Sequence, residues 1–268
     1  MATAPTIIRK KRVEVEIVTL SQQGGRNYNE DVHGQWNDGQ YIACLVADGA
    51  GGHGGGDVAA AIARTTILEG FSARPEISAN FLRTLLLRAN AAVVTRQADG
   101  GKLAGMRTTV VVALIDLHSD ELMWAHCGDS RAYLFRGGNA LARTVDHSLV
   151  QQMVAGGMID DEGARLHPQR NLLLSALGSS EAELDMTVSE SMKLLPGDVL
   201  LLCSDGVWET IGDAVLENML KQAASPRIWL KQLDESVRAI AKPDHDNYTA
   251  LTLWAYAEEE ITQMMDIK

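Results

Sequence analysis

Aspartate residues recur directly after apolar runs in this sequence. Asp48 follows the run 41–47, Asp129 follows 121–128, and Asp205 follows 199–204. A single aspartate in such a position usually forms a turn. Several of them at the ends of buried strands in one core can converge, and their mutual repulsion then requires cations. Carboxylate oxygens without histidine or cysteine favour Mg²⁺ or Mn²⁺ over Zn²⁺.

Further acidic residues and glycines extend this pattern. Glu30 and Asp31 precede a short extended segment, and Asp246 precedes the last strand-like run of the chain. Gly49 and Gly206 each follow an aspartate, and glycine lets the backbone approach a bound metal closely. The sequence therefore predicts an acidic cation site whose residues come from distant parts of the chain.

The elements that must position these residues are strands in three groups, with helices between them. β-Branched and apolar runs predict strands, and apolar residues at helical spacing predict helices. The strands between 108 and 135 follow one another too closely for parallel crossovers, which favours antiparallel pairing. Because regular strand–helix alternation is missing, an antiparallel sheet core covered by helices is predicted. Strands are expected at 13–17, 41–47, 108–116, 121–126, 131–135, 199–203 and 249–256, and helices at 58–71, 76–97 and most of 213–242.

The composition is that of a globular protein, and it limits the possible functions. The chain has 268 residues, of which 46% are hydrophobic and 22% charged, and a formal net charge of −11. Nucleic-acid binders and proteins of anionic membranes need excess positive charge, so neither function is expected. No run approaches the roughly 18 apolar residues of a membrane span. We expect one cytoplasmic domain over residues 12–257, with loose termini at 1–11 and 258–268.

The three cysteines, Cys44, Cys127 and Cys203, are odd in number, and each lies in or beside an apolar run. Buried reduced thiols are therefore expected rather than disulfides. This is typical of a protein from a reducing compartment. The first 18 residues also lack the apolar core of a signal peptide.

Six short motifs occur in a fixed order within residues 15–256, and they contain the acidic residues described above. In chain order they are Arg26-x-x-Asn29-Glu30-Asp31, Val46-Ala47-Asp48-Gly49 with Gly51-Gly52-His53, Gly105-x-x-Thr108-Thr109, Gly128-Asp129-Ser130-Arg131-Ala132, Ser204-Asp205-Gly206-Val207-Trp208 and Asp246-Asn247. Together they resemble the metal-dependent protein serine/threonine phosphatases of the PPM (PP2C-like) family, in its compact bacterial form. The family more often has Met where this chain has Ala50.

The resemblance implies an α+β fold and a role for each acidic residue. The fold would be a four-layer α-β-β-α sandwich, with two packed antiparallel sheets flanked by helices and two to three Mn²⁺ or Mg²⁺ ions in a cleft at one end. By the same resemblance, Asp48 bridges two metals, the Gly49 carbonyl and Glu30 or Asp31 hold one of them, Asp205 and Asp246 hold the other, Asp129 joins Asp205 at a third, and Arg26 clamps the substrate phosphate.

Such a site suits the hydrolysis of phosphoserine and phosphothreonine in proteins, with Asp48, Asp205 and His53 as the catalytic residues. Two cations about 3.5–4 Å apart can bridge a water molecule and lower its pKa towards neutrality. The resulting hydroxide would attack phosphorus in line, without a phosphoenzyme. Arginine at position 26 suits bidentate phosphate binding. A general acid should protonate the leaving oxygen; His53 is the candidate, and the alternative is a loop histidine that only orders water.

The reaction implies phosphorylated proteins as substrates and an opposing serine/threonine kinase in bacterial signalling. The loop variant over residues 48–53 favours the group whose kinase controls type VI secretion. We expect a monomer that binds neither nucleic acid nor membrane. The segment 147–180 has a helical and then an irregular pattern, and we expect it to form a flap beside the cleft.

Three other functions are less well supported. A catalytically inactive PP2C-fold module that binds phosphoproteins typically lacks a metal carboxylate or the phosphate arginine, whereas this chain keeps them all. The glycine spacing within residues 49–54 fits a dinucleotide site, but Asp48 would repel a pyrophosphate. A hydrolase triad built on Ser130 and His147 lacks the G-x-S-x-G turn.

Overall fold

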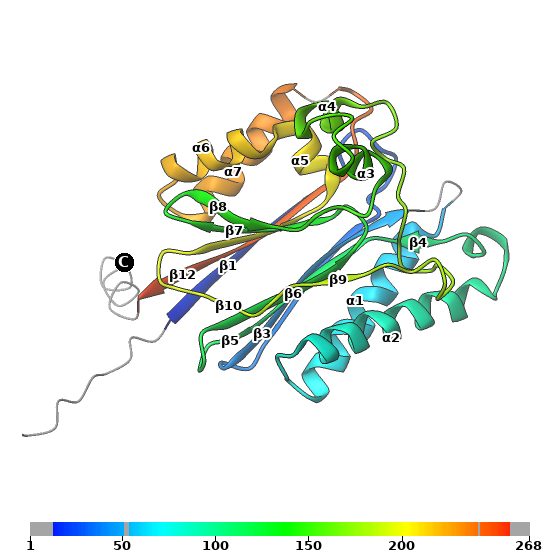
Figure 1. The fold of residues 1–268 in the computed structure, drawn as a ribbon, viewed down its shortest axis with the longest axis horizontal. Helices are drawn as coiled ribbons and strands as arrows, with labels where there is room; N and C mark the ends of the chain where they lie inside the picture. The colour runs from blue at the N-terminus through cyan, green and yellow to red at the C-terminus, as the bar shows by residue number, and fades with distance from the viewer. Residues whose placement is uncertain (1–12, 51–53, 241, 258–268) are drawn as a thin grey trace, which may run out of the picture.

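The computed structural model describes residues 13–50, 54–240 and 242–257. Two antiparallel sheets pack face to face, and helices cover both outer faces (Figure 1). Strands from the two ends of the chain are neighbours in the first sheet, because β1 and β12 pair along their whole length. This five-stranded sheet has the order β1 (Val13–Gln22), β12 (Tyr248–Ala257), β11 (Val199–Cys203), β7 (Arg131–Arg136) and β8 (Asn139–Arg143).

The second sheet joins strands that are mostly close in sequence. All of its pairs are antiparallel. The strands predicted at 108–116 and 121–126 pair with each other here, as their short connection predicted, whereas the strand predicted at 131–135 lies in the first sheet. Its main path is β10 (Met192–Lys193), β6 (Glu121–Cys127), β5 (Val110–Asp116), β3 (Tyr41–Ala50) and β2 (Asp31–Asn37), with β4 (Arg107–Thr108) paired to β3 and β9 (Thr187–Val188) paired to β6.

Helices form the two outer layers (Figure 1). The second sheet is covered by α1 (Gly56–Ala73) and α2 (Ala79–Gln97), which are followed by the short 3₁₀ helix η1 (Gly101–Leu103). The five-stranded sheet is covered by α5 (Asp205–Ile211), α6 (Asp213–Gln222) and α7 (Pro226–Ile240). The segment expected to be helical and then irregular contains α3 (Leu149–Ala155) and α4 (Asp161–Leu166). The predicted α+β four-layer sandwich is therefore confirmed.

Strand β3 shows how the sequence pattern follows from the layers. Residues 42–47 are all fully buried. Ala43 and Leu45 pack in the cluster under α1 and α2, whereas Cys44 and Val46 pack between the two sheets. Successive side chains of a strand point to opposite faces, so a strand covered on both faces is apolar throughout.

Several elements begin or end at other residues than the pattern predicted, and for two of them the structure shows the reason. α2 begins at Ala79 rather than at 76, because the Ser78 side chain caps the helix by accepting a hydrogen bond from the Phe81 amide. The strand expected over 108–116 is interrupted at Thr109, whose amide donates to the Asp48 carbonyl oxygen at 2.8 Å. That interruption belongs to the candidate site.

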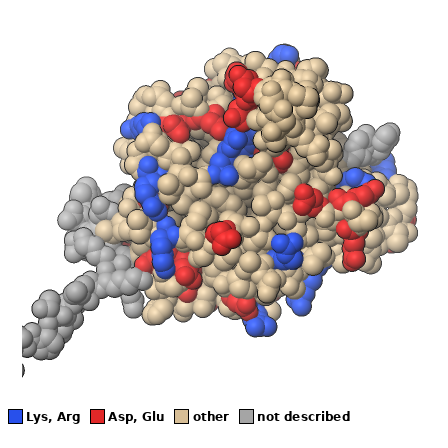
Figure 2. Space-filling view, viewed as in Figure 1, with Lys and Arg blue, Asp and Glu red and all other residues tan. Residues whose placement is uncertain are grey.

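The cysteines are as the sequence predicted, and the surface carries charges of both signs. Cys44, Cys127 and Cys203 are buried and free, as expected. Figure 2 shows basic and acidic side chains interspersed on one face, with wide uncharged areas between them. Among the described residues, no helix is both long and apolar enough to cross a membrane. The termini expected to be loose, 1–11 and 258–268, lie outside the described residues.

Candidate metal and phosphate site

The ends of the acidic strands meet at one end of the sandwich, around a cavity of about 310 Å³. Residues up to 220 positions apart in the chain are brought together there. His53 lies outside the described residues, and Asp31 does not line the cavity. The cavity is lined by the other predicted site residues: Arg26, Glu30, Asp48, Gly49, Asp129, Asp205 and Asp246.

Asp31 lies behind the cavity wall, directly across the β2–β3 ladder from Asp48. Its Oδ2 accepts a hydrogen bond of 2.7 Å from the Ser204 hydroxyl. Its Oδ1 is buried and has no hydrogen-bond partner among the described residues. The sequence left open whether Glu30 or Asp31 serves the site, and the structure places Glu30 at the cavity and Asp31 in support of Asp48.

Two threonines and a serine hold the backbone of Asp48 in place. Thr108 Oγ1 and the Thr109 amide both donate to the Asp48 carbonyl oxygen, at 2.9 and 2.8 Å. In return, the Asp48 amide donates to Thr109 Oγ1, which is also 2.7 Å from the Ser130 hydroxyl. Three of the sequence motifs therefore meet here, and the motif containing Thr108 and Thr109 acts by positioning Asp48.

Gly49 and Gly56 allow the chain to pass close behind Glu30. A Cβ on Gly49 would lie 2.3 Å from the Gly56 carbonyl carbon, and a Cβ on Gly56 would lie 2.6 Å from Glu30 Oε1. No side chain fits at either position without a backbone shift. The glycines are therefore required by this close approach, which leaves the Gly49 backbone at the cavity surface.

Asp205 is the first residue of α5, and the same helix carries two more side chains of the site. Trp208 Nε1 donates to the Asp129 carbonyl oxygen at 3.0 Å, so α5 also fixes the loop that carries Asp129. Glu209 lies one turn after Asp205 and adds a half-buried carboxylate beside it. Glu209 was missed by the sequence analysis, although its spacing of four residues from Asp205 places both on one helix face.

The other side of the cavity is closed by an ion pair and an asparagine. Arg26 Nη2 donates to Asp246 Oδ2 at 2.7 Å, and both side chains are partly exposed. Asn247 Oδ1 accepts a hydrogen bond from the Glu30 amide, and its Nδ2 donates to the Tyr28 carbonyl oxygen. The Asp246-Asn247 motif therefore ties the loop of Arg26 and Glu30 to the start of β12.

The electrostatics of the cavity show why cations fit it. Burial and the repulsion by Asp31 and Asp205 raise the pKa of Asp48 well above its ordinary value. Burial also raises the pKa of Asp129 to about 8 and that of Asp31 to about 6. The raised pKa of Asp205 has the same first cause, followed by repulsion from Asp129 and then Glu209.

Several carboxylate oxygens at this site lack hydrogen-bond partners. In the described part of the chain, they are Glu30 Oε1, Asp31 Oδ1, Asp205 Oδ1 and Glu209 Oε1. Buried unpaired acceptors with no donor fit a hard divalent cation, which binds oxygen ligands. No three His, Cys, Asp or Glu side chains among the described residues converge on a single ion position. Two of the carboxylates are instead hydrogen-bonded, Asp246 to Arg26 and Asp31 to Ser204.

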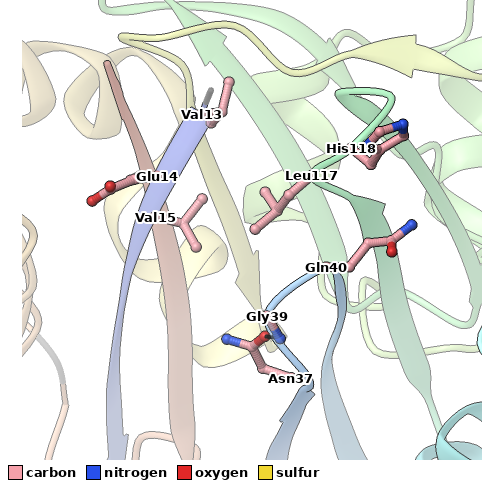
Figure 3. Close-up of a pocket in the computed structure, with 8 residues that line it drawn as sticks. All are labelled: Val13, Glu14, Val15, Asn37, Gly39, Gln40, Leu117 and His118. Atoms are coloured by element: carbon pink, nitrogen blue, oxygen red, sulfur yellow. Dashed lines mark hydrogen bonds between the residues drawn. The ribbon is translucent and has the colours of Figure 1, made fainter. Parts of the chain in front are cut away.

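A larger cavity, of about 540 Å³, lies at the opposite end of the sandwich and does not have this chemistry. It is formed by the start of β1 and by the β2–β3 and β5–β6 turns, and Figure 3 shows Val15 and Leu117 facing each other across it. Glu14 is the only carboxylate in the lining that the structure describes. Size therefore does not identify the functional cavity; the gathered carboxylates do.

The raised pKa values predict how the stability of the protein depends on pH without metal. Burial raises the pKa of Asp129 to about 8 in the folded state, whereas an unfolded aspartate loses its proton near the ordinary value of 3.8. The folded state therefore binds more protons above pH 4, and the free energy of unfolding falls as pH rises through the folded pKa. We expect the Tm in EDTA to fall by roughly 5 °C between about pH 6.5 and pH 8.5.

The pH range is chosen because His126 acts in the opposite sense at lower pH. Burial lowers the pKa of His126 to about 4, whereas an unfolded histidine titrates near the ordinary value of 6.5. Between these two values the unfolded state binds the extra proton, so His126 makes the free energy of unfolding rise with pH there. Circular dichroism melts of wild type and Asp129→Asn at matched pH values measure the effect, and the variant should show the smaller fall. A Tm that is constant or rises with pH in wild type would contradict the prediction.

Comparison with known proteins gives the family. A sequence model described as "Protein phosphatase 2C" matches residues 21–247. The chain is 33% identical over 247 residues to the serine/threonine phosphatase stp of Listeria monocytogenes serovar 1/2a, covering 89% of this chain and 93% of that protein.

Two solved structures show the same fold over almost the whole chain. The catalytic domain of the serine/threonine protein phosphatase PstP in complex with two manganese ions has a TM-score of 0.74 at 27% identity, covering 91% of this chain and 99% of that one. PppA of Pseudomonas aeruginosa, described as a key regulatory component of T6SS, has a TM-score of 0.72 at 27% identity, covering 92% and 100%. The chain therefore belongs to the protein phosphatase 2C (PPM) family of serine/threonine phosphatases, which use divalent metal ions.

Proposed function

We propose that this protein hydrolyses phosphoserine and phosphothreonine in proteins with two to three Mn²⁺ or Mg²⁺ ions held in the 310 Å³ cavity. The observation that carries the proposal is the set of buried carboxylates that line this cavity, with Arg26 at its rim. Asp48, Glu30 and the Gly49 carbonyl would hold one ion, with Asp31 behind them. Asp205 and Asp246 would hold the second, and Asp129 with Asp205 a third.

Metal ions bound there would supply a water of lowered pKa and neutralise the charge of the phosphate. The residues of the chain supply the rest. Thr108 and Thr109 fix Asp48, and Trp208 fixes the loop of Asp129, so the ligands are held before substrate arrives. Groups that are already in place need no rearrangement during the reaction, and this saving lowers the barrier to hydrolysis.

Arg26 is placed to exchange one anionic partner for another. It is about half exposed and donates to Asp246 through Nη2. A guanidinium offers two parallel donors that match a phosphate. Arg26 would turn from Asp246 to the substrate phosphate, which also frees the Asp246 oxygen. His53 stays the candidate general acid.

The proposed place of the protein in the cell is opposite a serine/threonine kinase in bacterial signalling. The loop sequence over residues 48–53 and the likeness to PppA support a role in type VI secretion control. Co-purification of the inactive protein with phosphoproteins, with and without a candidate kinase, would identify the pathway. A phosphoproteome that is unchanged on deleting the gene would contradict it.

The function itself is tested by hydrolysis of p-nitrophenyl phosphate and a phosphothreonine peptide by the purified protein. We expect turnover with Mn²⁺ or Mg²⁺ and none in EDTA, because the carboxylates alone repel a phosphate dianion. Arg26→Ala should mainly raise KM, and Arg83→Ala on the outer helix α2 is the control. A folded protein with no turnover in any divalent metal would instead be a phosphoprotein-binding module.

A further inference from the structure

A groove of about 500 Å³ adjoins the candidate metal site. The two cavities share three lining residues: Arg26, Asn171 and Asp246. A phosphoresidue seated at the metal site would therefore have the neighbouring residues of its own chain beside this groove. The inference below rests on the proposed function and concerns which phosphoproteins the site accepts.

The floor and the two walls of the groove come from three separate segments. α5 forms the floor, through Gly206, Glu209 and Thr210. The end of α4 with Arg170 and Asn171 forms one wall, and Ile240 at the end of α7 with Lys242, Asp244, His245 and Asp246 forms the other. The groove thus opens between the expected flap and the loop that carries Asp246.

Two arginines hold the flap wall against the floor. Arg170 Nε donates to Glu209 Oε2 at 2.7 Å, and Arg165 Nη1 donates to the Glu209 carbonyl oxygen at 2.6 Å. Arg165 also pairs with Glu162 through two hydrogen bonds. Because these charges are matched within the chain, the groove has its shape before a substrate binds.

Two large apolar side chains from different segments remain exposed in the lining of this groove. Leu166 is 65% exposed and Ile240 is 63% exposed. Single exposed apolar residues are ordinary, but here two of them line one groove beside a reaction site. An apolar side chain of a bound peptide could pack against them, which would remove its apolar surface from water and favour binding.

The charges of the groove differ from those of the metal site. Four basic and three acidic residues line the groove, whereas the metal cavity has one basic and five acidic residues. A polypeptide of ordinary charge is therefore not repelled from the groove.

We propose that this groove binds the polypeptide of the phosphoprotein substrate next to the phosphoserine or phosphothreonine, with an apolar side chain held between Leu166 and Ile240. The occupant is the substrate chain because the groove continues directly from the phosphate site through Arg26 and Asp246. The enzyme therefore prefers phosphorylation sites flanked by an apolar residue.

Kinetics on three substrates test the proposal with the full chain. The substrates are p-nitrophenyl phosphate and two phosphothreonine peptides, one flanked by leucines and one by serines. The double variant Leu166→Asp/Ile240→Asp should lower kcat/KM for the leucine peptide at least about fivefold. This is the size of effect seen when a residue that contributes to binding is removed from an interface. Turnover of p-nitrophenyl phosphate should stay unchanged, since it does not reach the groove. Leu87→Asp, an exposed leucine on α2 at the other face, is the matched control.

Two kinds of result would overturn the proposal. One is an equal loss on all three substrates in the double variant, which would show an effect on the metal site or the fold. The other is an unchanged preference for the leucine peptide. Fluorescence-polarisation binding of the unphosphorylated forms of both peptides in EDTA measures the groove without turnover and without repulsion of the phosphate by the carboxylates. If wild type hydrolyses nothing, the proposed function fails, while weaker binding of the leucine peptide by the variant still supports the groove.

Discussion

Asp205→Asn is expected to lower kcat for phosphopeptide hydrolysis by about 1,000-fold, because a carboxylate shared by two proposed metal positions supplies several kcal/mol. Asparagine keeps the size of the side chain and removes its charge. Asp205 is 7% exposed, and its Oδ1 has no partner among the described residues, so little else depends on that oxygen. The measurement is steady-state hydrolysis with Mn²⁺ at saturating peptide.

The thermal stability of the same variant separates a metal ligand from a structural residue. Removing a buried charge that Asp129 and Glu209 repel should leave the Tm in EDTA equal or higher. The rise in Tm that Mn²⁺ causes in wild type should be largely lost. Asp99→Asn, at an exposed position after α2, is the control for both measurements. Turnover within tenfold of wild type would exclude Asp205 as a ligand.

Asp146→Ala is expected to lower the free energy of unfolding by about 3–5 kcal/mol, because it leaves a buried arginine charge without its partner. Arg131 donates to both carboxylate oxygens of Asp146, at 2.9 and 2.7 Å. The two side chains are 9% and 3% exposed. The Arg131 guanidinium also lies 3.5 Å from the centre of the Trp208 ring. A displaced Arg131 would therefore also disturb the packing of α5, which carries Trp208. Urea unfolding followed by circular dichroism measures the change.

Two further variants test the physical reason for that loss. Asp161→Ala removes an ion pair with Arg143 in which Asp161 is 71% exposed, and it should cost less than about 1 kcal/mol. The double variant Arg131→Met/Asp146→Leu removes both buried charges and should recover most of the stability. If Asp146→Ala loses no more stability than Asp161→Ala, the prediction is wrong. In that case Asp213, whose Oδ1 lies 3.6 Å from Arg131 Nη1, is a sufficient partner for the buried charge.

The sequence determined the fold class and the kinds of residue at the site. Strand β3 could be predicted because a strand buried on both faces must be apolar throughout, and residues 42–47 are. The antiparallel pairing of β5 with β6 could be predicted because their connection is too short for a parallel crossover, whereas the move of β7 into the other sheet could not. The aspartates at the ends of such strands were visible as interruptions of apolar runs, and their order along the chain matched a known family.

The contacts inside the site were decided by the tertiary structure alone. Whether Glu30 or Asp31 faces the cavity depends on the β2–β3 register, which pairs Asp31 with Asp48. A shift of one residue would exchange the two carboxylates, and neither has an apolar pattern that fixes its side. The pairing of Arg26 with Asp246 spans 220 positions, a distance at which local sequence carries no signal.

Glu209 and the groove show the same limit most clearly. A single glutamate on a short helix has no sequence pattern that distinguishes it, and Glu209 gains its role only because Arg165 and Arg170 of the flap reach α5. Leu166 and Ile240 are isolated apolar residues in sequence and become a pair only across the groove. Residue types and strand ends follow from local chemistry, whereas which side chains meet follows from packing that joins segments far apart in the chain.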